Sequence, residues 1–382
     1  MSLKYYELNP RDLLFFRDAR PMDLDKSETA HRNVGHGAVW PRPDHLYNAV
    51  MHALIGSRSC GEAEYGKHGG VMVAGPYPLQ EGRLLFPRPL DWDMQIEPCR
   101  GTDLPDCLSM GFIDRVEGKK AYPAWISADE YGRYLSGKVG AGKSADELDA
   151  PKDGGAPLFY IEPRVATTID AASEATIRIA GKRSGQYQAE YLRLAQGVSL
   201  WCGIDCGEHG DPARVEAFIL GGQCGIVNAS AASQGLEAVF PTPTATPAGD
   251  GKFYVKWTLI APAYFERTGW LPGWCESSDK GLSADERRRS RGQVMFPDTA
   301  GVRLVGACTG KPFWFSGWDT LTGVKPTRLA VPAGSAYLFA CPSQETAQAL
   351  IGRLHMRRQS DFGPQGFGIG VCSSVLNVNF NS

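Results

Sequence analysis

The chain has 382 residues, of which 43% are hydrophobic and 21% are charged. A chain of this length can bury a sizeable core and can form two domains of ordinary size, which excludes one small domain. The 40 Lys and Arg residues and 42 Asp and Glu residues give a formal net charge of −2. This balance excludes a global attraction for phosphate, so any nucleic-acid site must be local.

The termini and the cysteines indicate the compartment. The first sixteen residues carry Lys4, Glu7, Arg11 and Asp12 and lack the uninterrupted apolar h-region of a signal peptide, and no later apolar run is long enough to span a bilayer. The ten cysteines are scattered along a long chain, which is typical of reduced thiols. We therefore predict a cytoplasmic protein with no membrane partner.

The first half of the chain shows the pattern of strands and one clear helix. Alternating apolar residues predict a strand over 3–8, and Pro43 opens a helix with one apolar stripe. Apolar runs at 71–74 and 84–86 predict two more strands. A strand over 194–204, a short helix over 212–218 and a strand over 225–229 follow. This order is that of a ferredoxin-like βαββαβ unit.

The second half repeats this plan after a break in composition. Residues 241–251 contain three prolines and two glycines without apolar periodicity, and they are the predicted linker. Strands are predicted over 253–261, 302–307, 335–340 and 370–378, with a helix over 343–356. The predicted domains are therefore 1–240, with a loop-rich insertion near 97–157, and 251–382 with a glycine-rich loop at 363–370. The fold class is α+β.

Residues Gly137 to Ser144 match GxxxxGK[ST], the loop that cradles nucleotide phosphates. A working loop of this kind follows a buried strand and leads into a helix. Here a polar helix is predicted before it, over 127–136, and Pro151 follows within two turns. A flexible loop is the better interpretation, so no nucleotide cofactor is expected and a P-loop NTPase ranks third among the candidate functions.

Two further sets of residues have the right chemistry for a site. Cys202, Cys206, His209 and Cys224 could hold zinc, but the spacing is not that of paired knuckles, and buried thiols explain the strand-like residues better. We predict no metal site, but the sequence leaves open whether these four residues bind zinc. Histidines at 31, 36, 45 and 52 could supply the base of a metal-independent ribonuclease.

Basic and glycine-rich segments could contact RNA. The basic clusters lie at Arg17 and Arg20, at Lys182 and Arg183, at 287–291 and at 353–358, and such clusters are more often solvated faces. The glycine-rich segment 363–370 either turns amide groups toward phosphates or forms a tight turn between helix and strand.

The order of several short motifs resembles one known family, the RAMP subunit of Cmr complexes that belongs to the Cas-five-like group. The matching motifs are Phe16-Arg17-Asp18-Ala19-Arg20-Pro21, Trp40-Pro41-Arg42-Pro43, Gly75-Pro76-Tyr77, Phe86-Pro87-Arg88-Pro89-Leu90-Asp91, Glu162-Pro163-Arg164-Val165, Leu220-Gly221-Gly222, Ser316-Gly317-Trp318-Asp319, Val331-Pro332-Ala333-Gly334-Ser335-Ala336-Tyr337 and the Gly-Phe-Gly at 366–368. The resemblance spans nearly the whole chain.

This resemblance implies two ferredoxin-like domains and a non-catalytic role in a type III-B CRISPR effector. The subunit would hold the 5′ handle of the guide RNA (crRNA) and dock on the large polymerase-like subunit, beside a RAMP backbone subunit. A RAMP endoribonuclease that processes precursor crRNA is the alternative. The predicted RNA-binding residues are Arg17, Arg20, Arg32, His36, Trp40, His45, Lys182, Arg183, Gly363, Gly366, Phe367 and Gly368.

Overall fold

The structure is a computed structural model that describes residues 3–18, 34–38, 40–56, 69–92, 94–98, 108–112, 123–138, 157–167, 173, 186–210, 212–277, 279–319 and 323–374. Its α-helices are α1 (Pro43–Ile55), α2 (Ala128–Leu135), α3 (Leu236–Val239), α4 (Ala284–Ser290) and α5 (Gln344–Leu354). Short 3₁₀ helices are η3 (Gly207–His209), η4 (Pro212–Val215), η5 (Gly273–Cys275) and η6 (Gly363–Gln365). No helix among these residues is long and apolar enough to cross a membrane.

Strands make up most of the regular structure. They are β1 (Lys4–Pro10), β2 (Val34–Gly35), β3 (Met72–Gln80), β4 (Arg83–Pro87), β5 (Met94–Pro98), β6 (Leu108–Phe112), β7 (Trp125–Ser127), β8 (Phe159–Thr167), β9 (Gln186–Leu194), β10 (Val198–Asp205), β11 (Ala217–Ile219), β12 (Ile226–Ala231), β13 (Phe253–Leu259), β14 (Arg303–Cys308), β15 (Phe313–Phe315), β16 (Trp318–Asp319), β17 (Gly323–Val324), β18 (Arg328–Ala330), β19 (Ala336–Cys341) and β20 (Gly370–Ser373). The protein is thus a mixed, β-rich structure with few helices, which confirms the predicted fold class in its coarse form.

The chain forms two compact units whose segments alternate along the sequence. The first unit contains Met1–Gly82, Pro157–Ala232 and Trp314–Arg328, and the second contains Arg83–Ala156, Ser233–Phe313 and Leu329–Ser382. This division differs from the two contiguous domains that the sequence predicts. Residues 83–156 belong to the second unit because buried contacts hold them to its central strand: Lys256 on β13 forms an ion pair with Asp91.

Segment 241–251 is not the free linker that its composition predicts. Ala245 is 1% exposed and belongs to the core of the second unit. Its amide donates to the side-chain oxygen of Gln348, and its carbonyl accepts from the side chain of Gln344, both on α5. The two glutamines replace the backbone partners that a proline-rich segment lacks, so the segment lies along the helix.

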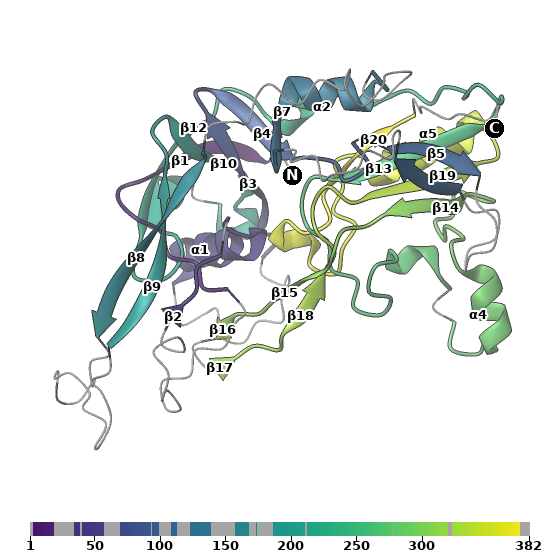
Figure 1. Ribbon diagram of the computed structural model, residues 1–382. Coiled ribbons are helices and arrows are strands. Elements are labelled where there is room, and N and C mark those ends of the chain that lie inside the picture. Colours follow the sequence, from purple (N-terminus) through teal and green to yellow (C-terminus); the bar gives the residue numbers. More distant parts are fainter. Residues whose placement is uncertain are drawn as a thin grey trace. The chain divides into compact units, whose positions relative to one another are not determined.

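Five strands of the first unit lie in the order β11-β12-β1-β10-β3, and each neighbouring pair is antiparallel (Figure 1). Helix α1 lies against β3, η4 and β11. It begins at Pro43, which needs no amide partner in the first turn, and it buries the apolar stripe that predicts it, including Leu46, Val50 and Leu54. The short connection η4 is a single 3₁₀ turn where the sequence predicts a helix.

The hairpin of β8 and β9 is a separate feature of the first unit. Its strands pair in register from Phe159–Leu194 to Thr167–Gln186, and Figure 1 shows them as long neighbouring arrows. The start of β9 pairs in parallel with β2, since Val34 lies opposite Gln188. The strand predicted over 194–204 corresponds to β10, which begins at Val198, whereas Leu194 ends β9. Gly197 with φ +75° lies in the turn between β9 and β10.

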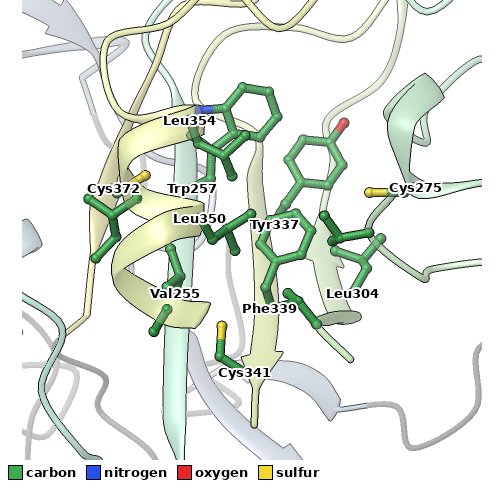
Figure 2. Close-up of a cluster of buried hydrophobic side chains, with 14 of the residues drawn as sticks. Val255, Trp257, Cys275, Leu304, Tyr337, Phe339, Cys341, Leu350, Leu354 and Cys372 are labelled. Carbon is green, nitrogen blue, oxygen red and sulfur yellow. The ribbon is translucent and has the colours of Figure 1, made fainter. Parts of the chain in front are cut away.

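The second unit has a four-stranded antiparallel sheet in the order β14-β19-β13-β20. Without the edge strand β11, the first unit has the order β12-β1-β10-β3. In this set and in the second sheet, the last strand in sequence lies beside the first, and the third lies between the first and the second. Figure 2 shows Leu350 and Leu354 of α5 in one core cluster with Val255 and Trp257 of β13, and with Tyr337 and Phe339 of β19. Ser343 caps α5 by accepting from the amide of Thr346.

Candidate functional site

Two short segments of the first unit run side by side and carry the first predicted RNA-binding residues. Arg17 pairs with Gly37 in an isolated bridge, the amide of Asp18 donates to the carbonyl of His36 at 3.0 Å, and the amide of Ala38 donates to Phe16 at 2.6 Å. We call residues 16–18 and 36–38 the paired strip. Arg17 is exposed on it, so its guanidinium is accessible to an anion.

His36 and Glu190 form the polar center of the paired strip. The imidazole Nδ1 lies 3.2 Å from the carboxylate Oε2, and the amide of Gly37 donates to the same oxygen at 3.2 Å. Both side chains remain about 29% and 28% exposed. A Cβ at Gly37 would lie 2.4 Å from the carbonyl oxygen of Glu190, so this close approach requires glycine. The carboxylate thus orients the imidazole at an accessible position.

Trp40 packs within the first unit. Its indole N–H donates to the carbonyl of Pro76 at 2.9 Å, and its ring lies 6.1 Å from that of Phe159. The side chain is half-buried and packs against the core cluster. The N–H and the ring contact with Phe159 help to position the segment before α1, and an RNA contact of the half-buried Trp40 stays a prediction.

His45 is held at the start of α1. Its Nδ1 accepts the amide of Arg42 at 3.3 Å, and its ring stacks on Phe16 with centroids 5.0 Å apart. Burial first, and then the nearby Arg42 guanidinium, lower the pKa of His45 from 6.5 to about 3. The imidazole is therefore neutral near pH 7, a very weak base, and a cap of the helix in place of the predicted RNA contact.

The depressed pKa of His45 predicts a pH dependence of stability. Below about pH 6.5 the unfolded chain protonates this histidine, while the folded chain does so only near pH 3. The stabilising contribution is therefore complete above pH 6.5 and falls as the pH decreases, by at most about 1.4 kcal/mol per pH unit. Urea unfolding at pH 7 and pH 5 should show a larger loss for the parent than for His45→Gln.

The comparison with His45→Gln removes the contribution of a second histidine, His355, to the pH dependence of stability. His355 is 6% exposed, and burial also lowers its pKa. Since both proteins keep His355, its effect cancels in the difference. An identical pH dependence in the two proteins would contradict the assignment of a neutral, half-buried His45.

Arg42 is a functional candidate that sequence reasoning did not select. Its guanidinium forms two hydrogen bonds of 2.9 Å with Asp44 and donates to the carbonyl of Ser316 at 3.0 Å. Arg42 lies in the Trp-Pro-Arg-Pro motif, and Ser316 is the first residue of the Ser-Gly-Trp-Asp motif. Both motifs belong to the family resemblance, so they could have pointed to Arg42 from the sequence. Glu190 had no such signal, because it lies far from His36 in sequence.

The glycine-rich segment of the second unit is a tight turn. Gly366 has φ +90° and Gly368 has φ +70°, conformations that favour glycine. The amide of Gly363 donates to Ser360, that of Gly366 to Gly363, and that of Gly368 to the carbonyl of Pro262 at 2.7 Å. Of the two interpretations that the sequence leaves open, these three glycines follow the tight turn, because their amides are bound to carbonyl groups of the protein.

The side chains of the turn are also buried. Phe367 is fully buried and lies edge-on to Phe362, which stacks on Tyr264. Phe367 is therefore a packing residue, in place of the predicted contact with RNA. Gln365 is also fully buried, and its carboxamide has no hydrogen-bond partner among the described residues.

Several predicted residues lie outside the described part of the chain. Arg20, Arg32, Lys182 and Arg183 are among them, and so are residues 139–144 of the P-loop-like segment. The segment before it is described: Ser127 caps α2 by accepting from Glu130, and Gly137 and Lys138 continue from the end of that helix as a turn. A helix thus precedes the motif where a phosphate-binding loop has a buried strand.

The possible zinc ligands lie in different environments. Cys202 on β10 is fully buried, and burial raises the pKa of its thiol. Cys224 is exposed, and His209 lies against Gly69. Among the described residues, no group of three or more side chains of the metal-binding types is gathered at one point.

Comparisons with known proteins identify the family. The family model described as CRISPR-associated protein (Cas_Cmr3) matches residues 6–368. A chain in the cryo-EM structure of the Type III-B Cmr-beta complex bound to cognate target RNA and AMPPnP has a TM-score of 0.47 and 13% identity, and the match covers 88% of this chain and 86% of that chain.

A chain in the crystal structure of a Csm3-Csm4 subcomplex of the type III-A CRISPR-Cas interference complex has a TM-score of 0.39 and 12% identity, with 87% and 92% covered. No curated protein matches this sequence. The structural likenesses are too distant to carry functional weight, but the family match covers nearly all of the chain and confirms the family resemblance of the motifs. The chain therefore belongs to the Cmr3 family of CRISPR-associated proteins.

Proposed function

We propose that this chain is a non-catalytic, RNA-binding subunit of a type III-B CRISPR effector. It holds the repeat-derived 5′ handle of the crRNA and docks on the large polymerase-like subunit, beside a RAMP backbone subunit. The observation that carries this proposal is the family match over residues 6–368. The shared strand order of the two sheets supports a ferredoxin-like plan for both units.

The paired strip supports a handle site in the first unit. Arg17 is exposed and can contact phosphate, and His36 is accessible and held by Glu190. Phosphate contacts position an RNA, whereas contacts with base edges specify its sequence. We assign the first role to Arg17 and the second to His36, while Trp40 and His45 position the segments around them.

The glycine-rich turn contributes in a different way from the one its composition predicts. Three of its four glycines, Gly363, Gly366 and Gly368, use their amides in hydrogen bonds within the protein. A contact with RNA at these glycines would therefore rest on the close approach that glycine permits and not on free amide groups. A substitution that changes the shape of this turn is then expected to weaken handle binding without removing any charge.

The handle site is tested by guide RNA retention. In complexes reconstituted with repeat-containing crRNA, Arg17→Ala is expected to retain less RNA than the parent. Its RNA affinity should also depend less steeply on salt concentration, by the amount for the loss of about one phosphate contact. The matched control is Arg11→Ala. Arg11 is also exposed in the first unit, but its guanidinium is bound to the side chain of Asn228.

The same samples test each part of the proposal separately. Equal retention by Arg17→Ala and Arg11→Ala would refute the assignment of Arg17, and a tagged chain that recovers neither crRNA nor other Cmr subunits would refute the function. The recovered RNA is expected to be intact. Shortened RNA in EDTA that becomes intact again with His36→Ala would establish the ribonuclease alternative.

A further inference from the structure

Helix α4 and the start of β14 bring four arginines together in the second unit. We call Arg287, Arg289, Arg291 and Arg303 the α4 arginine cluster. Arg287 and Arg289 are exposed, and Arg291 and Arg303 are half-buried. The cluster lies outside the paired strip and outside the glycine-rich turn.

Backbone contacts fix the position of this cluster. Gln293 and Arg303 form an isolated bridge, and the amide of Leu304 donates to the carbonyl of Gly292 at 2.6 Å. The guanidinium of Arg303 donates to the carbonyl of Arg289 at 3.3 Å. The end of α4 is thus joined to the start of β14, and arginines that are distant in sequence become neighbours.

The cluster has no carboxylate partner among the described residues, whereas other arginines of the same unit are paired. Arg267 binds Glu276 at 2.6 Å, and Arg353 binds Asp298 at 3.2 Å. The nearest acidic residue on α4, Glu286, is engaged by the amide and hydroxyl of Ser283 at 2.8 and 2.7 Å. The described part of this unit therefore supplies no carboxylate that neutralises the positive charge of the cluster.

Arg291 adds a second observation. Its guanidinium lies 6.0 Å above the center of the Trp270 ring, and its Nε is buried with no hydrogen-bond partner in the part of the chain that the structure describes. An arginine beside an aromatic ring is a common platform for a nucleobase. Favourable interaction with the helix dipole would account for arginines near the end of α4, but not for the unpaired Nε beside an aromatic ring.

We propose that the α4 arginine cluster binds the phosphate backbone of single-stranded RNA without sequence preference, as a contact separate from the handle site. Guanidinium groups match phosphate oxygens in a bidentate geometry. The overall charge of −2 confines such attraction to a local patch. The arginine and aromatic pair favours RNA over an acidic protein surface.

The test uses the full chain and fluorescein-labelled oligouridine, which has no repeat sequence, in anisotropy titrations at several KCl concentrations. The variant is Arg287→Gln with Arg289→Gln, which removes two exposed, unpaired charges. The control is Arg267→Gln with Arg353→Gln, which removes two charges from the same unit that are already paired. Thermal unfolding establishes that both proteins are folded.

The cluster variant is expected to bind about tenfold more weakly at low salt, with a salt slope reduced by about 1.4, the value for two phosphates of a single strand. The control is expected to bind within about twofold of the parent. Equal losses in both proteins would show a bulk charge effect and overturn the proposal, and so would an unchanged affinity of the cluster variant.

Two further measurements separate this proposal from its alternatives. Polyglutamate that displaces oligouridine as effectively as unlabelled oligouridine would show that the cluster binds acidic chains in general and would overturn the assignment to RNA. The cluster variant is expected to retain the crRNA handle in reconstituted complexes. If this variant lost retention of the crRNA handle, the cluster would not be a site separate from the handle site. The handle site itself is tested by Arg17→Ala.

Discussion

Lys256→Met is expected to destabilise the second unit by about 3 to 5 kcal/mol, because it removes one partner of a buried ion pair. The Lys256 ammonium lies 3.0 Å from Asp91 Oδ2, and the two side chains are only 11% and 5% exposed. The ammonium also lies 4.0 Å from the center of the Tyr134 ring. Methionine preserves the stem of the side chain but leaves the Asp91 carboxylate uncompensated.

The hydroxyl of Tyr134 connects this ion pair to α2. It donates to Asp91 Oδ1 at 2.5 Å, and Thr258 Oγ1 lies 3.1 Å away. Burial first, and then the Asp91 charge, raise the pKa of Tyr134 well above its usual value, so it remains a neutral donor. The cluster thus holds residues 88–92 and α2 to β13, and its loss is expected to loosen both.

The measurement is urea unfolding followed by tryptophan fluorescence, since Trp92 stacks on Tyr134. The matched control is the double variant Lys256→Met with Asp91→Asn, which removes both charges. Replacing both partners of a buried pair costs much less than removing one. Equal destabilisation by the single and double variants would show that packing, and not the uncompensated charge, determines the loss.

Gly368→Ala is expected to destabilise the glycine-rich turn by more than about 1 kcal/mol, because alanine is strained at a positive φ. Gly368 has φ +70°, and a Cβ there would lie 2.5 Å from the Cβ of Ser360 and 2.8 Å from its amide nitrogen. Backbone atoms cannot move aside as a flexible side chain can. The variant should unfold at lower temperature and retain less crRNA in reconstituted complexes.

Gly352→Ala is the control for this prediction. Gly352 lies in α5, and a Cβ there meets no atom within 4 Å. Alanine is the better helix former, so this variant is expected to gain about 0.5 to 1 kcal/mol and to retain RNA normally. A Gly368→Ala protein with the parent's stability and RNA retention would contradict both the strain and the role of the turn.

Patterns among neighbouring residues were sufficient to predict the helices and strands that depend on short-range features of the sequence. Pro43 and its apolar stripe predict α1, and Ser343 with the following stripe predicts α5, because capping and helical periodicity are properties of neighbouring residues. The four strands of the second sheet also lie where their apolar runs predict them, although residues 375–378 of the last predicted strand are outside the described chain. The motif order likewise identified the family.

The site depended on contacts that sequence spacing does not encode. Arg17 is exposed on the paired strip as the sequence predicts, but His36 owes its orientation to Glu190, which reaches it from β9. Trp40, His45 and Phe367 have the side-chain types of an RNA site, yet each is used internally. Residue type predicts the chemistry a side chain can perform, whereas burial decides whether a ligand can reach it.

By itself, the sequence determined the family, the α+β class and the positions of α1, α5 and the four strands of the second sheet. Only the tertiary structure decided that residues 83–156 join the second unit and that 241–251 lies along α5. It also decided that the amides of Gly363, Gly366 and Gly368 donate to carbonyl groups of the protein. The physical reason is that periodicity and capping are local, while the pairing of buried charges and backbone groups depends on segments that meet only when the chain is folded.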